Sequence, residues 1–298
     1  MSNFPQVTLA IIGAQKAGTT SLSGYISQCK NIANQLPVEF DFFLNDKSFA
    51  LGFDSYATRF LSYSSNQRIV IKNVTLSVSD IGMSRLRDHS PDSKIVLILR
   101  EPVDRIYSSL RMAVSRGWLD RNFDLFCSSI QSNKNNMFYR NFLLPGLYAD
   151  QVKRVSSYFP SDSVRIYLYE DLRDNANDLT LDILDWIGEA PYKIDLTPRN
   201  VTHARDVKFP IVALGLNHFY RSKFSSFLKG IFPYSWILKI KSFMESFLFS
   251  KRSLSEPLMS EKLERLVNDF YEGPTRELRK CVDSLGLSVR TFGSSCWF

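Results

Sequence analysis

The stretch Leu9-Ala10-Ile11-Ile12-Gly13-Ala14-Gln15-Lys16-Ala17-Gly18-Thr19-Thr20-Ser21-Leu22 decides the fold. Its apolar, β-branched start leads into a short loop bounded by Gly13 and Gly18, and helical character begins at Thr19 or Thr20. Glycines let a backbone approach an anion closely, and the start of a helix adds positive partial charge. The stretch therefore predicts a strand, an anion-binding loop and a helix.

The side chains of this loop favour phosphate binding over a plain glycine turn. Lys16 brings a full positive charge, and Thr19 and Thr20 bring hydroxyl donors. The spacing from Gly13 to Gly18 matches a Walker A loop, but Thr19 stands where a nucleotide triphosphatase needs lysine. We therefore expect a phosphate ligand held by a loop of a different kind.

The composition is that of an ordinary globular protein, because 44% of the 298 residues are apolar and 22% are charged. The net charge of +7 suggests an anionic ligand, yet the basic residues are dispersed, so no nucleic-acid partner is predicted.

The four cysteines have neither CxxC spacing nor a nearby histidine, which indicates thiols in a reducing compartment and no metal site.

The sequence shows no targeting segment and no linker between domains. The apolar run from Val7 to Ala14 is too short to span a membrane and has no basic leader or cleavage site, so we expect a cytoplasmic protein. No internal repeat or low-complexity linker divides the chain. We therefore predict one domain over residues 1–298, with an α/β core at about 7–205 and a helical extension at about 206–298 that covers the substrate cleft.

Two further apolar runs end in basic residues. Arg68 to Asn73 predicts a buried strand with Lys72 near its carboxyl end, and Lys94 to Arg100 predicts a parallel strand covered on both faces. The ligand crevice of an open α/β sheet lies at this edge. Arg100 can bind a phosphate directly, whereas a Walker B strand ends in aspartate for magnesium. An ordinary edge lysine is the alternative interpretation of Lys72.

The remaining elements follow from apolar periodicity. A further strand is predicted at 164–169, and helices are predicted at 21–29, 49–63, 123–130, 146–159, 179–187 and 260–285, the last interrupted at Gly273-Pro274. The aromatic stretch from Leu36 to Phe43 carries Glu39 and Asp41, which point to the same side if the stretch is extended. Either acid is then a candidate general base, and a solvated loop is the alternative.

With these residues in place, the chain resembles the sulfotransferases that use 3′-phosphoadenosine 5′-phosphosulfate (PAPS), in particular the bacterial small-molecule enzymes related to the Golgi heparan branch. The family's Lys-x-Gly-Thr-Thr loop, which holds the 5′-phosphosulfate, corresponds to Lys16-Ala17-Gly18-Thr19-Thr20. Its strand that ends in Arg, with Ser eight residues later, holds the 3′-phosphate and corresponds to Arg100 and Ser108. The resemblance runs from about Val7 to Arg205, and more loosely to Leu285.

The acceptor motifs of that family match less closely. Its Glu-x-His-Phe-Phe segment, whose Glu is the base, corresponds to Glu39-Phe40-Asp41-Phe42-Phe43, and its Lys-Thr-Pro segment to Lys72-Asn73-Val74. Asp41 in place of His puts two acids in the catalytic stretch. This predicts a small neutral or cationic acceptor, such as a guanidinium-bearing bacterial natural product, sulfated on a hydroxyl or an amine.

The resemblance implies a P-loop-like, three-layer α/β fold, in-line transfer with adenosine 3′,5′-bisphosphate (PAP) as product, and no metal. It also implies most of the site residues. The polar loop around residue 203 adds three cofactor residues, Asn200, His203 and Arg205. The expected catalytic residues are Glu39, Lys16 and Lys72; the cofactor residues are Lys16, Ala17, Gly18, Thr19, Thr20, Ser21, Arg100, Ser108, Asn200, His203 and Arg205; and the acceptor residues are Asp41, Phe42 and Tyr148.

Two other functions remain open at this point. A P-loop kinase or nucleotide triphosphatase acting on small molecules would need magnesium and an acidic strand end. A membrane-surface or partner-binding protein would use the aromatic and basic segment 219–249, which we otherwise interpret as helices that cap the cleft. We expect a small-molecule acceptor and no membrane contact, and the sequence predicts no oligomeric state.

Overall fold

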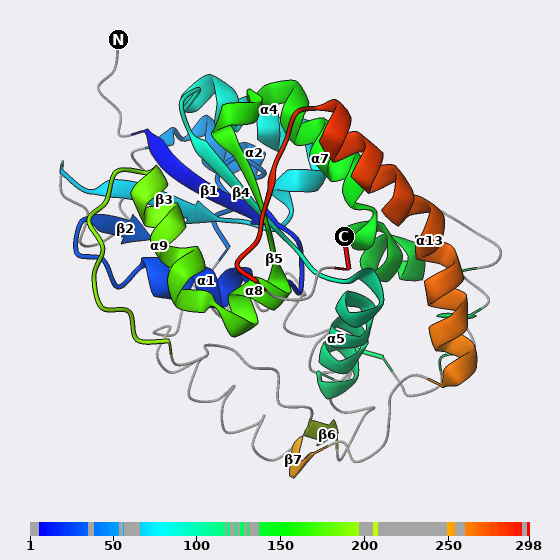
Figure 1. The fold of residues 1–298 in the computed structure, drawn as a ribbon. Helices are drawn as coiled ribbons and strands as arrows, with labels where there is room; N and C mark the ends of the chain where they lie inside the picture. The colour runs from blue at the N-terminus through cyan, green and yellow to red at the C-terminus, as the bar shows by residue number, and fades with distance from the viewer. Residues whose placement is uncertain are drawn as a thin grey trace. The chain divides into compact units, whose positions relative to one another are not determined.

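The computed structural model describes residues 6–34, 39–53, 56, 66–116, 118–119, 123, 126–127, 130, 137–196, 205–207, 249–253, 260–293 and 297–298. Six strands form one parallel sheet in the order β2-β3-β1-β4-β5-β8 (Figure 1). Their bounds are β1 Val7–Gly13, β2 Ile32–Asn34, β3 Arg68–Lys72, β4 Lys94–Leu99, β5 Val164–Leu168 and β8 Val289–Arg290. The predicted α/β fold with a central parallel sheet is confirmed.

Strand β1 lies in the middle of the sheet and is buried because both of its neighbours and both faces cover it. It pairs with β3 on one side, where Ala10 lies opposite Ile71, and with β4 on the other, where Ala10 lies opposite Ile95. From Leu9 to Ile12 no side chain is exposed. A strand that is apolar on both faces fits only such a position, which is why its sequence reads as a continuous apolar run.

Helices cover both faces of this sheet (Figure 1). The chain runs from β1 to the edge strand β2 and then returns through β3 to β4 on the other side of β1, and right-handed crossovers in opposite directions put their helices on opposite faces. In agreement, α1 packs on α9, and α4 packs on α7. The helices are α1 Thr19–Ile26, α2 Asp46–Ala50, α4 Asp80–His89, α5 Pro102–Ser115, α7 Tyr148–Tyr158, α8 Tyr169–Asp174, α9 Ala176–Trp186 and α13 Glu261–Ser284.

The C-terminal region differs from the prediction in two ways. Helix α13 continues through Pro274, so the predicted interruption at Gly273-Pro274 is wrong. Proline removes one intrahelical hydrogen bond, but the helix buries an apolar face that includes Leu263, Val267 and Leu278, and this burial offsets the loss. The short strand β8 was not predicted, and it extends the main sheet beside β5. Most of the helices predicted at 49–63 and 123–130, and the aromatic segment 219–249, lie outside the described residues.

The chain divides into two compact units. The first comprises residues 1–105, 143–200 and 269–298 and contains the six-stranded sheet; the second comprises residues 106–142 and 201–268. In the second unit, β6 (Arg205–Val207) and β7 (Phe249–Ser253) form an antiparallel pair. The assignment of residues 1–298 to a single domain stays a prediction. No helix within the described ranges has the length and apolar character needed to cross a membrane.

The burial of β4 generates a stability prediction. Ile98 has no exposed surface, so Ile98→Ala removes packed methylenes and leaves a cavity that should cost about 2–5 kcal/mol of unfolding free energy. Ile81→Ala, at a side chain on α4 that is 55% exposed, is the matched control and should change stability by less than about 0.5 kcal/mol. Urea unfolding measures both. Equal effects of the two substitutions would contradict the central position of β4.

Candidate functional site

The predicted site residues of the first unit lie at the carboxyl edge of the sheet. Parallel strands β1, β3, β4 and β5 all end there, followed by the glycine loop, Asn73, Arg100 and Tyr169 respectively. Backbone bonds tie these ends together: the Ala14 amide donates to the Ile98 carbonyl at 2.6 Å, and the Asn73 amide donates to the Ile11 carbonyl at 3.0 Å. The topology therefore brings the separate motifs of the sequence to one edge.

The glycine loop ends in a residue with a left-handed backbone, directly before α1. Gly18 has φ +80°, immediately precedes α1, and gives the helix no side-chain cap. The first turn of α1 also carries no acidic residue, so its N–H groups keep their positive partial charge. A Cβ atom on Gly18 would lie 2.7 Å from Cδ2 of Leu172 in α8, so any other residue at this position would force the buried Leu172 side chain to shift.

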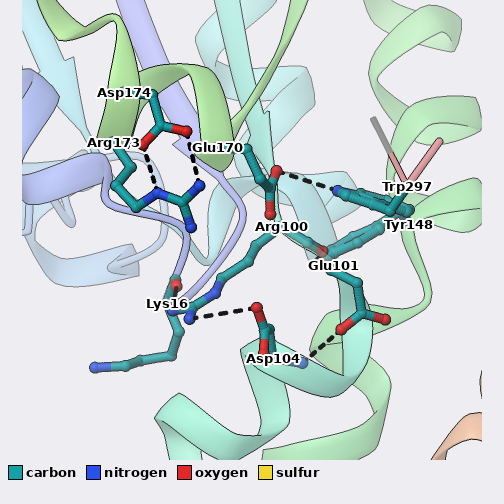
Figure 2. Close-up of polar contacts among 9 residues, drawn as sticks. All are labelled: Lys16, Arg100, Glu101, Asp104, Tyr148, Glu170, Arg173, Asp174 and Trp297. Carbon is teal, nitrogen blue, oxygen red and sulfur yellow. Dashed lines mark hydrogen bonds and ion pairs between the residues drawn. The ribbon is translucent and has the colours of Figure 1, made fainter. Parts of the chain in front are cut away.

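Arg100 lies beside this loop in a restrained position (Figure 2). Its guanidinium is stacked 4.3 Å from the ring centre of Tyr169, and its Nη1 donates to the Lys16 carbonyl at 3.3 Å. The contact with Asp104 is longer, at 3.9 Å, and 16% of the Arg100 side chain is exposed. The buried Nε has no hydrogen-bond partner in the described part of the chain. Arg100 is thus held in place with donor capacity left for a ligand.

Tyr148 and Glu101 support the backbone around Arg100. The Tyr148 hydroxyl donates to the Arg100 carbonyl at 2.8 Å, and burial raises the pKa of that hydroxyl, so it keeps its proton. Glu101 accepts from the Asp104 amide at 2.7 Å, and burial raises the pKa of the Glu101 carboxyl. Only 2% of Tyr148 is exposed, so its burial gives no support to the predicted contact with an acceptor.

Lys72 joins two other predicted residues. Its ammonium donates to Glu39 at 2.5 Å and to the Thr20 hydroxyl at 3.3 Å. The second carboxylate oxygen of Glu39 accepts from the Val74 amide at 3.1 Å. The Lys72 side chain is 2% exposed and that of Glu39 is 42% exposed, so a buried cation holds a solvent-accessible carboxylate. Lys72 is therefore more than an edge lysine.

Asn73 fixes the segment that carries Glu39. It is 2% exposed, its side-chain amide donates to the Phe40 carbonyl at 3.0 Å, and its side-chain oxygen accepts from the Thr75 amide at 2.8 Å. The Phe40 amide in turn donates to the Lys72 carbonyl at 2.8 Å. Asn73 stands where the resembled family has threonine, and here it builds the turn that positions Glu39.

The other acid of this segment has a different environment. Asp41 is exposed, and its carboxylate accepts a hydrogen bond from the buried hydroxyl of Tyr56. Phe42 is 2% exposed and packs in an aromatic cluster with Phe40, Phe43, Phe49, Phe53 and Tyr56. Asp41 is accessible to an acceptor, whereas an acceptor contact through Phe42 gains no support from its burial.

The remaining predicted residues belong to the second unit or are not among the described residues. Ser108 is half-buried on α5, in the part of that helix that belongs to the second unit, and Arg205 begins β6 in the same unit. Asn200 and His203 fall outside the described residues. The roles of these four residues in cofactor binding stay predictions.

The donor groups at this edge fit a phosphorylated nucleotide. They comprise an uncapped helix start, the hydroxyls of Thr19 and Thr20, the lysines at positions 16 and 72, and an arginine with a buried unpartnered Nε. All are donors or cations, which is what phosphate oxygens accept from. No group of three His, Cys, Asp or Glu side chains suited to a metal ion occurs in the described ranges.

Sequence reasoning missed the contribution of α8. Tyr169 contacts Arg100 and Leu172 packs against the position of Gly18, but the sequence predicts a strand at 164–169 and no helix directly after it. A six-residue helix is too short for apolar periodicity to reveal. The one available signal is that strand β5 ends at the same sheet edge as the other motifs, which makes any residue after it a candidate.

Comparisons with known proteins show the family and the fold of this chain. The family model described as "Sulfotransferase domain" matches residues 7–205. Bifunctional heparan sulfate N-deacetylase/N-sulfotransferase 2 of Homo sapiens is 26% identical over 193 residues, which cover 61% of this chain and 22% of that protein. The Bos taurus protein of the same name is 26% identical over 290 residues, covering 94% and 30%. The chain thus spans less than a third of these relatives.

Among solved structures, a sulfotransferase from Alicyclobacillus acidocaldarius has a similar fold. The superposition has a TM-score of 0.56 at 23% identity and covers 73% of this chain and 92% of the other. At this identity the likeness shows the fold.

The close approach of Gly18 to α8 generates a testable prediction. Gly18→Ala should cost about 1–3 kcal/mol, because the new methyl group meets the buried Leu172, and it should weaken PAP binding measured by calorimetry. Gly52→Ala is the matched control: Gly52 also has positive φ, +85°, but a Cβ there meets nothing within 4 Å. It should show backbone strain alone, about 1 kcal/mol, with unchanged PAP binding. Indistinguishable effects of the two variants would contradict the role of this contact.

Proposed function

The chain belongs to the sulfotransferase domain family, and on that premise we propose that it transfers the sulfuryl group of PAPS to an amine or hydroxyl of a small acceptor, with Glu39 as the base. The observation that carries this proposal is the buried Lys72 ammonium, which contacts both Glu39 and Thr20. A single cation thereby links the candidate base to the loop that would hold the donor. Such a link suits a reaction that occurs between the two.

The residues that would hold the donor lie in the glycine loop, at the start of α1 and directly after β4. When bound, the donor supplies a sulfuryl group carried on a phosphate leaving group. Lys16, Thr19 and Thr20 would bind its 5′ side together with the first N–H groups of α1, and Arg100 would bind the 3′-phosphate. The donors on the 5′ side would stabilise negative charge that develops on the departing 5′-phosphate oxygen, and they would need no reorganisation during the reaction.

Glu39 has the access and the support that a base needs. Its side chain is 42% exposed, so an acceptor can reach it, while Lys72 and the Val74 amide fix its two oxygens. As the acceptor atom bonds to sulfur, the sulfur–oxygen bond to the phosphate breaks and the acceptor proton passes to Glu39. Positioned general bases contribute about 10²–10⁴-fold to such reactions.

We propose a neutral or cationic acceptor, such as a guanidinium-bearing natural product. Asp41 adds a second accessible carboxylate two residues from Glu39, held by Tyr56. An ammonium or guanidinium group would be attracted to this pair of acids, and a polyanion would be repelled. The curated relatives are named N-sulfotransferases, which favours nitrogen as the acceptor atom that receives the sulfuryl group.

The three described cysteines are free thiols, in keeping with a cytoplasmic location.

Arg100→Ala tests the cofactor assignment. Wild-type protein should bind PAP by calorimetry without magnesium, and Arg100→Ala should lose about 2–5 kcal/mol of binding free energy, because a phosphate loses its charged partner. Arg87→Ala is the matched control, since Arg87 is half-exposed on α4 and pairs with its neighbour Asp88. It should bind PAP as wild type does. Binding only of a magnesium triphosphate would instead identify a P-loop kinase or triphosphatase.

Glu39→Gln tests the base. The amide keeps an oxygen for Lys72 but cannot take a proton at neutral pH, so turnover should fall by about 10²–10⁴-fold while PAP binding is retained. Asp46→Asn, at an exposed acid paired with Arg85, is the control and should keep full turnover. Thermal unfolding of both variants checks that the fold is intact. Unchanged turnover in Glu39→Gln would rule out this residue as the base.

The acceptor proposal needs a separate measurement. Asp41→Asn removes the second negative charge at the candidate acceptor site and should raise KM for a cationic acceptor while leaving KM for a neutral acceptor unchanged. A panel of amine, guanidinium and alcohol acceptors, assayed with PAPS, measures this split. Equal KM values for cationic acceptors in the wild type and in Asp41→Asn would contradict the role given to Asp41.

A further inference from the structure

Helix α8 contacts two parts of the candidate phosphate site, Arg100 and the glycine loop. Its first residue, Tyr169, lies under the Arg100 guanidinium at 4.3 Å, and its Leu172 packs against the position of Gly18. The helix has only six residues and no side-chain cap at its start. A helix of this length is not stable by itself, so contacts from other elements must hold it in place.

Helix α9 and strand β5 contact α8, and further support comes from the C-terminal segment, residues 287–293 and 297–298, which follows α13 and includes β8. The Trp297 indole N–H donates to Glu170 of α8 at 3.2 Å, and the Phe292 amide donates to Asp171 of α8 at 3.0 Å. Glu170 is 8% exposed and Asp171 is 0% exposed, so both bonds are shielded from bulk water. Two successive residues of the short helix are therefore fixed by this segment.

Trp297 also reaches the other support of Arg100. Its ring lies 6.2 Å from the ring of Tyr148, whose hydroxyl donates to the Arg100 carbonyl (Figure 2). Its own carbonyl accepts from Arg279 of α13 at 2.8 Å, which anchors it to the helix. The Trp297 indole thus contacts two residues. One is Glu170, the neighbour of the Tyr169 that stacks on Arg100, and the other is Tyr148, whose hydroxyl binds the Arg100 carbonyl.

We propose that the C-terminal segment, residues 287–293 and 297–298, positions the phosphate site, and that Trp297 and Glu170 are positioning residues for Arg100. This segment lies outside the range that the family model matches, residues 7–205. The inference rests on the proposed function, because it assumes that Arg100 binds the 3′-phosphate of the donor. Trp297 acts through α8 and Tyr148 and need not touch the nucleotide.

The test compares variants of this contact in the full chain, with PAP as the probe. Trp297→Phe keeps an aromatic ring but removes the N–H that binds Glu170, so it should weaken PAP binding about five- to tenfold. Glu170→Ala should have a similar effect, and the double variant should be no worse than either single one, since both remove the same bond. Glu170→Gln, which keeps an acceptor oxygen, should restore binding close to the wild type.

Arg290→Gln is the matched control within the same segment. Arg290 pairs with Asp182 of α9 and makes no hydrogen bond or ion pair with α8 among the described residues, so its loss should leave PAP binding unchanged even where it lowers the melting temperature. In steady-state assays, Trp297→Phe should raise KM for PAPS while KM for the acceptor and kcat stay at wild-type values. A role in stability alone would give no such split.

Three results would overturn the inference, and they are distinguishable. If wild-type protein binds PAP and Trp297→Phe binds it equally well, the segment does not position the site and the proposed function stands. If wild-type protein binds no PAP, the proposed function and this inference fail together. Equal weakening by Trp297→Phe and Arg290→Gln would indicate general loosening of the segment, which also contradicts the proposal.

Discussion

The Lys72 ammonium is the interaction on which the site depends. Its side chain is 2% exposed at the carboxyl end of a central strand, and removing a full charge from water costs several kcal/mol unless a partner compensates. Glu39 provides the opposite charge, and Thr20 accepts a further hydrogen bond. Because the buried ammonium needs these partners, the segment that carries Glu39 and the start of α1 that carries Thr20 both lie next to the end of β3. The three pieces of chain are distant from one another in sequence. The electrostatics of one residue thus fixes the spacing of the candidate base and the phosphate loop.

The sheet was predictable because its strands carry unusually direct signals. The runs from Val7 and Lys94 are apolar on both faces, and such runs fit only the interior of a parallel sheet, as β1 and β4 confirm. The glycine loop was predictable because Gly18 stands where the chain must adopt positive φ beside another element. In both cases a local pattern is imposed by a strong steric or burial constraint.

Other features could not be predicted, because they depend on tertiary packing. Nothing local distinguishes Tyr148 as a buried support of Arg100 from an exposed tyrosine that contacts a ligand. Pro274 normally ends a helix, and only the burial of residues on either side keeps α13 continuous. Strand β8 has two residues, too few for any periodicity, and its pairing with β5 decides its structure. The replacement of Thr by Asn73 weakens a sequence motif, yet its side chain builds the turn that the motif serves.

The position of β1 between β3 and β4 has a consequence for how the protein acquires its function. The strand that carries the phosphate loop pairs with partners about 60 and 85 residues away in sequence, and Arg100 needs Tyr169 beneath it. Contacts so distant along the chain form late, because each must first overcome the entropy of closing a long loop. No short fragment can therefore contain a working anion site, even though the loop looks self-sufficient in sequence. Nucleotide affinity should appear only when most of the sheet has assembled, which makes ligand binding a reporter of complete folding.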